Sequence, residues 1–287
     1  MNLFNSFFSP AKVNLFLRVF NKRPDGYHEI SSLMQPISLY DEISIVVKDG
    51  EGVSISCADS RVPDDSTNLA AMAAQAILDA TGVRKRIVIA IRKHIPVGAG
   101  LGGGSSNAAA VLMALNGMLE AGFDDAALMN MGAKLGSDVP FFILKSAAIA
   151  RGRGEELEKV EPPDYRYILI NPGFEVSTAW AYRNFDLTNA KEDNTLLYSK
   201  KPFDGLDDAA VRGLLVNDLE SITIKRYPEI ARLKERLLEA GAIGALMSGS
   251  GPTVFGVFRD RQDALGAYER IRGSIARECF VTLADGL

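Results

Sequence analysis

A glycine-rich segment over residues 96–106 is the part of the sequence best suited to chemistry on a phosphate. It holds five glycines and two serines in the nine positions from Gly98 to Ser106. Glycine has no Cβ, so such a loop can turn its backbone N–H groups toward an anion. The alanine-rich run that follows predicts a helix, whose N-terminus also favours phosphate. We therefore expect a phosphate-binding loop here.

The glycine spacing fits more than one kind of phosphate loop. Gly98, Gly100 and Gly103 match a dinucleotide-binding loop, which also needs an acidic residue about 20 positions later, at the end of a second strand. Glu120 and Asp124 lie at that distance, but they follow a helical pattern. A Walker loop is excluded because no Gly-Lys-Ser or Gly-Lys-Thr sequence follows these glycines. A dinucleotide-dependent oxidoreductase stays open as an alternative.

Apolar and polar residues alternate over residues 11–19, which predicts a strand. Lys12 and Asn14 lie on the same, polar face of this strand. Ser9 and Lys12 have the Ser-x-x-Lys spacing of serine β-lactamases. The Ser-Asp-Asn and Lys-Thr-Gly sequences of that site are absent, however. An ordinary exposed strand lysine is the structural alternative to a catalytic Lys12.

Asp138 is a second candidate for catalysis. It follows a predicted helix over residues 125–135, which Gly136 closes as a C-cap, and it precedes a proline and a strongly apolar run. A carboxylate at such a boundary can cap a helix. Flanked by apolar residues, it can instead act as a general base. The sequence leaves both roles open.

Tyr27 and His28 come directly after the turn signal Arg23-Pro-Asp-Gly26. A tyrosine ring can stack on a flat ligand while the adjacent histidine reads the polar edge of that ligand. A surface histidine after a turn is the structural alternative.

A second glycine-rich segment runs from Met247 to Gly256, between two predicted strands. It is either a simple hairpin turn or a place where another backbone or a ligand comes close. Its small residues, Ser248 to Gly251, permit such an approach.

The periodicity of the apolar residues predicts the elements that position these side chains. A buried strand over residues 86–91 precedes the glycine-rich loop, and a helix over 105–119 follows it. A further helix is predicted over residues 69–80, and further strands over 30–37 and 43–47.

Two prolines within Lys159–Asp164 mark a domain boundary near residue 160, which predicts domains over residues 1–160 and 161–287. Beyond the boundary, the elements follow the order of a β-α-β-β-α-β ferredoxin-like domain. Its strands are predicted over residues 167–170, 245–247, 253–258 and 280–283, and its helices over 228–240 and 262–276.

The composition limits the class of protein. The chain has 287 residues, with 47% hydrophobic and 24% charged residues and a net charge of −4. This acidic balance argues against a nucleic-acid binder, which usually has a basic face. No apolar run approaches the roughly 20 residues of a membrane span, and no signal-peptide pattern begins the chain. With only Cys57 and Cys279, and no disulfide framework, we expect a cytoplasmic enzyme.

Taken together, these segments resemble the GHMP kinases over nearly the whole chain. The glycine-rich loop and the Gly-Ser-Asp-Val-Pro sequence at 136–140 are typical of the family, and Pro10–Leu15 and Ser248–Thr253 also match. The Asp-Gly-Tyr-His sequence at 25–28 resembles members that bind a cytidine-bearing substrate. The resemblance implies an α+β fold with two domains. The N-terminal domain would be ribosomal-protein-S5-like α/β and the C-terminal one ferredoxin-like.

The resemblance also implies a reaction, in which the γ-phosphate of ATP passes to a hydroxyl group of a small molecule carrying cytidine diphosphate. By this resemblance, Asp138 takes the hydroxyl proton and Lys12 lies beside it and holds it ionised. Asn14 is expected to contact the substrate. Tyr27 and His28 are expected to hold the cytosine, with Tyr182 on the opposite face of the base.

An ATP site and a Mg²⁺ ion are implied in the same way. The sequence offers no dedicated acidic metal ligand, so Mg²⁺ is expected on phosphate oxygens, with Ser106 or Asp138. The residues expected at ATP are Pro96, Val97, Gly98, Ala99, Gly100, Leu101, Gly102, Gly103, Gly104, Ser105 and Ser106, with Asn68 and Leu69 on the adenine side.

Three alternatives stay open at this point. Another GHMP kinase, acting on homoserine or mevalonate, would need no cytidine site. A dinucleotide-dependent oxidoreductase would bind NAD in place of ATP. A nucleotide-sensing module without activity would use Asp138 only as a helix cap. We expect a monomer or a weak homodimer, with no nucleic-acid or membrane partner.

Overall fold

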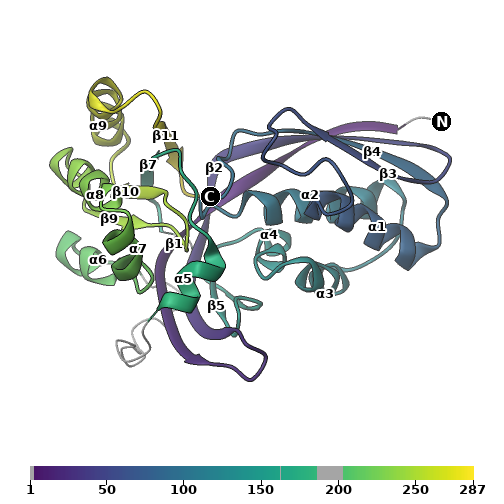
Figure 1. The fold of residues 1–287 in the computed structure, drawn as a ribbon, viewed down its shortest axis with the longest axis horizontal. Helices are drawn as coiled ribbons and strands as arrows, with labels where there is room; N and C mark the ends of the chain where they lie inside the picture. Colours follow the sequence, from purple (N-terminus) through teal and green to yellow (C-terminus); the bar gives the residue numbers. More distant parts are fainter. Residues whose placement is uncertain (1–2, 162, 186–202) are drawn as a thin grey trace. The chain divides into compact units, whose positions relative to one another are not determined.

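The computed structural model describes residues 3–161, 163–185 and 203–287. They form two compact units, and two long strands, β1 (Leu3–Lys22) and β2 (His28–Asp49), contribute residues to both (Figure 1). The domain boundary expected near residue 160 stays a prediction. The first unit comprises Met1–Ala11, Leu39–Val97 and Gly102–Lys145, and the second comprises Lys12–Ser38, Gly98–Leu101 and Ser146–Leu287.

The first unit is a sheet with helices on one side (Figure 1). Its β2 segment pairs antiparallel with β4 (Lys85–Arg92), and β3 (Gly52–Cys57) pairs parallel with β4. Alternate residues of β4 are buried, as expected of a strand with one face on a core. The helices of this unit are α1 (Leu69–Thr81), α2 (Gly103–Met118), α3 (Asp125–Leu135) and α4 (Val139–Leu144).

Helix α1 begins and ends at the signals that the sequence contains. The Asn68 side chain caps it by accepting a hydrogen bond from the Ala70 N–H at 2.9 Å. Gly82 ends it in the left-handed region, with φ of 68°. The predicted helix over residues 69–80 is therefore confirmed. The helix predicted over 105–119 is α2, which begins two residues earlier.

The second unit contains a four-stranded antiparallel sheet in the order β11-β7-β10-β9. Helix α8 precedes β9, and α9 lies between β10 and β11 in the chain. This order confirms the predicted ferredoxin-like arrangement. The bounds are β7 (Arg166–Asn171), α8 (Glu229–Glu239), β9 (Gly244–Met247), β10 (Val254–Phe258), α9 (Arg261–Ser274) and β11 (Phe280–Asp285).

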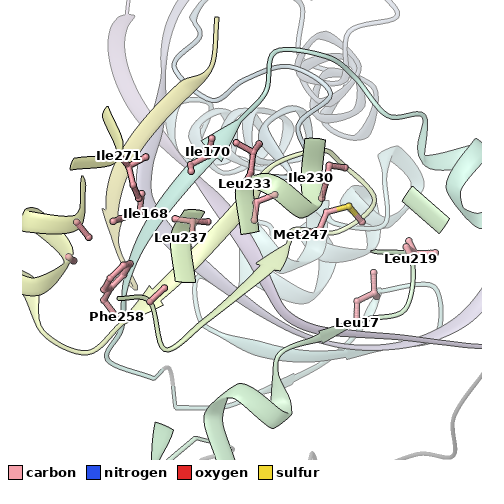
Figure 2. Packing of buried hydrophobic residues seen from close by; sticks show 14 of the residues in the cluster. Leu17, Ile168, Ile170, Leu219, Ile230, Leu233, Leu237, Met247, Phe258 and Ile271 are labelled. Atoms are coloured by element: carbon pink, nitrogen blue, oxygen red, sulfur yellow. The ribbon is translucent and has the colours of Figure 1, made fainter. Parts of the chain in front are cut away.

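The core of this unit lies between the sheet and its two helices. Figure 2 shows Leu233 and Leu237 of α8 and Ile271 of α9 beside Ile168 and Ile170 of β7. Each of these side chains contributes about 1.5–3 kcal/mol when fully buried. This packing holds β9 and β10, and with them the second glycine-rich segment that joins the two strands.

Several short elements complete the second unit, and the sequence predicted only a helical region, without bounds, between the strand at 167–170 and the helix at 228–240. Each of these elements has two to seven residues, too few for a period to show. By contrast, residues 30–37 and 43–47 were expected to form two separate strands, and both belong to the single long strand β2. The short elements are β5 (Ala148–Arg151), β6 (Glu156–Lys159), α5 (Thr178–Asn184), α6 (Asp208–Leu214), β8 (Val216–Asn217) and α7 (Glu220–Arg226).

Pairing fixes these short strands to the long ones. β5 pairs antiparallel with β2 at Ser32–Met34 and also with β6, while β8 pairs parallel with β1. In the described ranges, no helix combines the length and the apolar character that crossing a membrane requires.

Candidate active site

The glycine-rich loop joins β4 to α2, and its backbone has the conformation that only glycine adopts readily. Gly98, Gly100 and Gly102 have φ of 65°, 78° and 72°. Gly102 is the N-cap of α2 and gives it no side-chain hydrogen bond. The first N–H groups of this 16-residue helix therefore suit an anion.

Ser106 places a buried hydroxyl group in the first turn of α2. Its side chain is 1% exposed, and its Oγ has no hydrogen-bond partner among the described residues. A buried polar atom left unpaired costs about 1–3 kcal/mol. An atom of this kind at a helix N-terminus is a candidate ligand contact.

The second glycine-rich segment packs against the Gly98–Leu101 part of the loop, within the second unit. A Cβ on Gly251 would lie 2.2 Å from the Gly100 nitrogen, much closer than real contacts. Ser248 Oγ donates a hydrogen bond to the Gly100 carbonyl at 3.0 Å. The segment is thus a connection between strands and also a close approach of two backbones.

Lys12 is buried in the second unit, with 4% of its surface exposed. Its Nζ donates to Asn14 Oδ1 at 2.7 Å and to the Gly100 carbonyl at 3.2 Å. Asn14 in turn donates to Ser32 Oγ at 2.8 Å. The alternative of an exposed strand lysine is therefore wrong. A buried ammonium group needs such partners, and they direct it to the glycine-rich loop.

Asp138 lies in the first unit at the start of α4, partly buried. It has the N-cap position, yet its side chain makes no capping hydrogen bond. Gly136 ends α3 as expected, but with an extended φ of −178° in place of the left-handed cap. A Cβ on Gly136 would lie 3.5 Å from Ser105 Oγ, so this segment lies beside the start of α2.

Asn68 and Leu69 differ in how they relate to the loop. The Asn68 amide is engaged at both ends, because it caps α1 and donates to the Pro63 carbonyl at 2.7 Å. Leu69 lies near the loop, since a Cβ on Gly104 would be 3.7 Å from its Cδ1. The structure thus brings Leu69 to the loop, while Asn68 supports the helix behind it.

A buried polar cluster around Asp41 was missed by the sequence analysis. Asp41 is fully buried and accepts hydrogen bonds from the N–H groups of His94 and Ile95, at 2.8 Å and 2.9 Å. It also pairs with Lys93 and accepts from Asn107 Nδ2 at 2.9 Å. Ile95 directly precedes the loop and Asn107 directly follows it. Asp41 therefore holds the two residues that flank the loop, both of them in the first unit.

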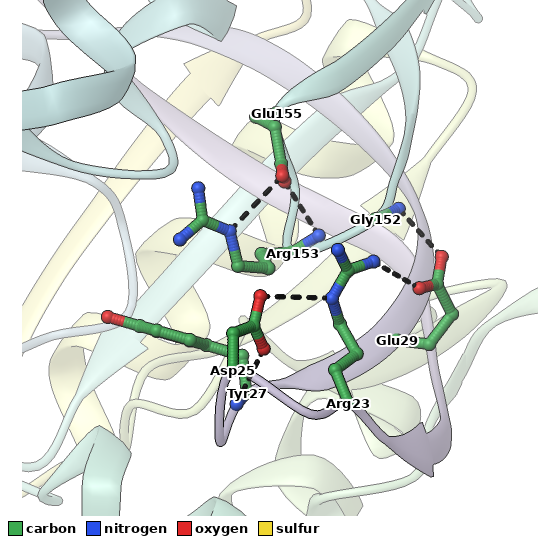
Figure 3. Close-up of polar contacts among 7 residues, drawn as sticks. All are labelled: Arg23, Asp25, Tyr27, Glu29, Gly152, Arg153 and Glu155. Atoms are coloured by element: carbon green, nitrogen blue, oxygen red, sulfur yellow. Dashed lines mark hydrogen bonds and ion pairs between the residues drawn. The ribbon is translucent and has the colours of Figure 1, made fainter.

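Charged side chains fix the turn that precedes Tyr27 (Figure 3). Arg23 donates to Asp25 Oδ2 at 3.3 Å and to Glu29 Oε2 at 2.6 Å. Asp25 Oδ1 accepts the Tyr27 N–H at 3.1 Å. Partial desolvation raises the pKa of the Asp25 carboxyl, but these hydrogen bonds outweigh it and the pKa is lowered. Tyr27 itself is 54% exposed.

His28 and Tyr182 come together in the second unit. Their rings stack with centroids 5.5 Å apart and an interplanar angle of 27°. Burial lowers the pKa of His28, and the charge of Lys22 lowers it further. The ring is therefore neutral at pH 7, with one nitrogen as donor and the other as acceptor. The contact expected between Lys12, in the second unit, and Asp138, in the first, stays a prediction.

Comparisons with known proteins show which family this chain resembles. Residues 68–146 match the family model of the GHMP kinases N terminal domain, and residues 204–275 match GHMP kinases C terminal. A curated protein of Syntrophotalea carbinolica named 4-diphosphocytidyl-2-C-methyl-D-erythritol kinase is 50% identical, over 93% of this chain and 94% of its own. One of the same name from Pelobacter propionicus is 49% identical, over 93% and 94%. A crystal structure of 4-(cytidine 5'-diphospho)-2C-methyl-D-erythritol kinase superposes on this chain with a TM-score of 0.81 and 35% sequence identity. The match covers 99% of this chain and 100% of the chain in that structure.

Proposed function

The chain belongs to the GHMP kinases, in the group of 4-diphosphocytidyl-2-C-methyl-D-erythritol kinases, and we propose the matching reaction for it. It transfers the γ-phosphate of ATP to the 2-hydroxyl of 4-diphosphocytidyl-2-C-methyl-D-erythritol, releasing ADP. This step belongs to non-mevalonate isoprenoid biosynthesis. The observation that carries the proposal is the 50% identity with a curated relative of that name over 93% of the chain.

The ATP phosphates bind, in this proposal, at the loop over residues 96–106. Phosphoryl transfer depends on positioning and on charge stabilisation more than on covalent work by the protein. The left-handed glycines and the N-terminus of α2 favour an anion, and Ser106 offers a buried hydroxyl without a partner in the described ranges. These features support the phosphate site.

Mg²⁺ fits this site as an ion held chiefly by phosphate oxygens and water. Among the described residues, no three acidic, histidine or cysteine side chains gather as a metal site. Ser106 or Asp138 would add a protein ligand, which is sufficient because Mg²⁺ commonly uses one or two protein ligands. When bound, it would neutralise charge that develops on the phosphates.

Asp138 is the proposed general base, which takes the proton of the substrate hydroxyl. Its carboxylate does not cap α4, although it has the position to do so. Lys12 is the proposed cation that favours the ionised form of Asp138. Asn14 holds Lys12 through the hydrogen bond at 2.7 Å and is the proposed substrate contact beside it.

The cytidine group is proposed to bind at Tyr27, His28 and Tyr182. Tyr27 offers an exposed ring on a fixed turn, and stacking on a base contributes about 1–3 kcal/mol. Neutral His28 has a donor and an acceptor for the edge of the base. The His28 ring stacks directly on the Tyr182 ring, with centroids 5.5 Å apart, so Tyr182 has to move off His28 to cover the face of the base opposite Tyr27.

Some features of the enzyme stay predictions. These are a cytoplasmic location, a monomer or a weak homodimer, and the absence of a nucleic-acid partner.

A coupled ADP-release assay tests the function directly. The full-length protein, with ATP and Mg²⁺, is given the diphosphocytidyl substrate, mevalonate or homoserine. We expect turnover only with the diphosphocytidyl substrate. Preference for mevalonate or homoserine would assign the chain to another branch of GHMP kinases. Calorimetry with NAD beside ATP tests the oxidoreductase alternative, and NAD binding in place of ATP would favour it.

A further inference from the structure

The guanidinium group of Arg153 lies over one face of the Tyr27 ring, and the function proposed above does not use it. Arg153 Cζ is 5.0 Å from the ring centroid. This distance is within the roughly 6 Å over which a cation is attracted to an aromatic face. The two residues come from different turns, one before β2 and the other between β5 and β6.

Arg153 is held in place by its own turn (Figure 3). Glu155 Oε1 accepts a hydrogen bond from Arg153 Nε at 3.1 Å, and its Oε2 accepts the Arg153 backbone N–H at 2.6 Å. Gly152 and Gly154 flank the residue with φ of 70° and 113°, which makes the turn tight. The side chain is 32% exposed, so its position depends on these contacts.

The two turns are also fastened to each other. Glu29 accepts a hydrogen bond from Arg23 at 2.6 Å with one oxygen and from the Gly152 N–H at 3.0 Å with the other. The Ile30 N–H donates to the Gly152 carbonyl at 2.8 Å. Arg153 and Tyr27 are therefore presented by one connected network, and their stacking does not depend on two independent loops.

We propose that Arg153 is a positioning residue for the cytidine group, which rests on the proposed function. Its guanidinium covers one face of Tyr27 and leaves the opposite face for the base. An exposed tyrosine on a turn otherwise samples several side-chain rotamers. Holding the ring before binding removes part of the entropy loss on association. Arg153 thus acts through Tyr27 and changes the affinity for the substrate, leaving the phosphoryl transfer itself unaffected.

Calorimetry with cytidine 5′-diphosphate tests this role. Arg153→Met keeps an unbranched, apolar side chain over the ring and removes the cation. We expect the Kd for this probe to rise about 2- to 5-fold, the range of an exposed cation–π contact. Arg153→Lys retains the cation and is expected to recover part of the affinity. The kcat, and the KM for ATP, are expected to stay as in the wild type.

A matched control is Arg272→Met, because Arg272 lies over the Tyr268 ring at 6.0 Å in α9. The control loses the same kind of contact and is expected to leave the Kd unchanged. An Arg153→Met protein that behaves like this control would overturn the proposal. So would an Arg153→Lys protein that binds no better than Arg153→Met.

The double variant with Tyr27→Leu separates action through the ring from direct contact with the diphosphate. If Arg153 acts through Tyr27, the double variant binds no worse than Tyr27→Leu alone. Full additivity would mean a direct contact and would overturn the positioning role. If Tyr27→Leu itself leaves the Kd unchanged, Tyr27 is not the platform, and the proposed cytidine site fails together with this inference. ADP release from the diphosphocytidyl substrate still tests the proposed reaction separately.

Discussion

The two glycine-rich segments of this chain have similar compositions and different surroundings. The first, over residues 96–106, leads into the 16-residue helix α2 and leaves a buried hydroxyl without a partner in the described ranges. The second, over Met247–Gly256, contains the connection between two antiparallel strands and brings Gly251 against Gly100. Both segments need glycine where Gly100 and Gly251 meet, but only the first leads, through the left-handed Gly102, into the N-terminus of a long helix.

This difference predicts how substitutions behave. A change on the ligand side, which includes the first loop and Asp138, is expected to alter turnover or ATP affinity with a modest effect on stability. A change in the supporting segment is expected to lower stability and ATP affinity together, because the first loop loses its support. Measuring the ATP affinity or turnover and the free energy of unfolding for each variant tests this difference between the two segments.

Asp138→Asn is expected to have the largest effect, on turnover. The substitution keeps the shape of the side chain but removes the proton acceptor. The kcat should fall about 10²- to 10⁴-fold, whereas the melting temperature should hardly change. Steady-state kinetics and thermal unfolding measure the two quantities.

A true capping aspartate is the control for this variant. Asp124 caps α3 by accepting the Ala127 N–H at 2.8 Å. Asparagine caps about as well as aspartate, so Asp124→Asn should be nearly silent in both measurements. A folded Asp138→Asn protein with the turnover of this control would remove Asp138 from the mechanism.

Gly251→Ala comes next, with a stability effect. The added Cβ would lie 2.2 Å from the Gly100 nitrogen, so one backbone has to shift. We expect a loss of about 3 kcal/mol in the free energy of unfolding and weaker ATP binding, measured by denaturant unfolding and calorimetry. Gly273→Ala is the control, because nothing lies within 4 Å of its Cβ position. Intact stability with normal ATP binding in Gly251→Ala would contradict the supporting role.

Gly102→Val is expected to affect mainly ATP binding. A branched residue at φ of 72° is strained by about 1–3 kcal/mol, and Gly102 directly precedes the first N–H groups of α2, at which the phosphates are proposed to bind. The control is Gly82→Val, because Gly82 has φ of 68° and nothing near its Cβ position. Both variants should lose similar stability. Only Gly102→Val should lose ATP affinity, by about 10-fold or more. Equal affinities would show that the loop does not contact the phosphates.

The sequence predicted the parts of this arrangement that depend on local pattern. The glycine-rich loop, its flanking strand and helix, and the span of α1 follow from side-chain type and from spacing within a few residues. The ferredoxin-like order followed from the succession of periodic segments. The residues proposed for catalysis were found largely through family resemblance, because spacing alone left Lys12 and Asp138 with structural alternatives.

The Asp41 cluster was missed although the sequence contains a signal for it. Asp41 lies two residues from both Leu39 and Ile43 along β2, so it belongs to the same face of the strand as these two buried residues. A carboxylate on the apolar face of a strand needs partners, and this observation alone predicts a buried polar cluster. Its partners Lys93 and Asn107 lie 52 and 66 residues away in the sequence, so only the fold identifies them.

Contacts between backbone segments that are distant in the sequence could not be predicted, for the same reason. The sequence suggested that some backbone or ligand approaches Gly251, but not that the partner is Gly100. The stacking of Arg153 on Tyr27 joins two turns that no motif connects. Such pairs are set by strand pairing, here between β2 and β5, and a single sequence carries no record of register.

Ser248→Ala is expected to have the smallest effect and to give the sharpest test of the supporting role. Its Oγ donates to the Gly100 carbonyl at 3.0 Å, and the residue is fully buried. Loss of one such hydrogen bond costs about 0.5–1.5 kcal/mol in the free energy of unfolding, and we expect ATP affinity to fall about 2- to 3-fold with it. Ser250→Ala is the control from the same segment, because the Ser250 hydroxyl forms a hydrogen bond with Thr178 Oγ1 at 2.7 Å and not with the first glycine-rich segment. A loss of ATP affinity in Ser250→Ala as large as in Ser248→Ala would mean that the whole segment binds ATP. The supporting role, and with it the contrast between the two loops, would then be wrong.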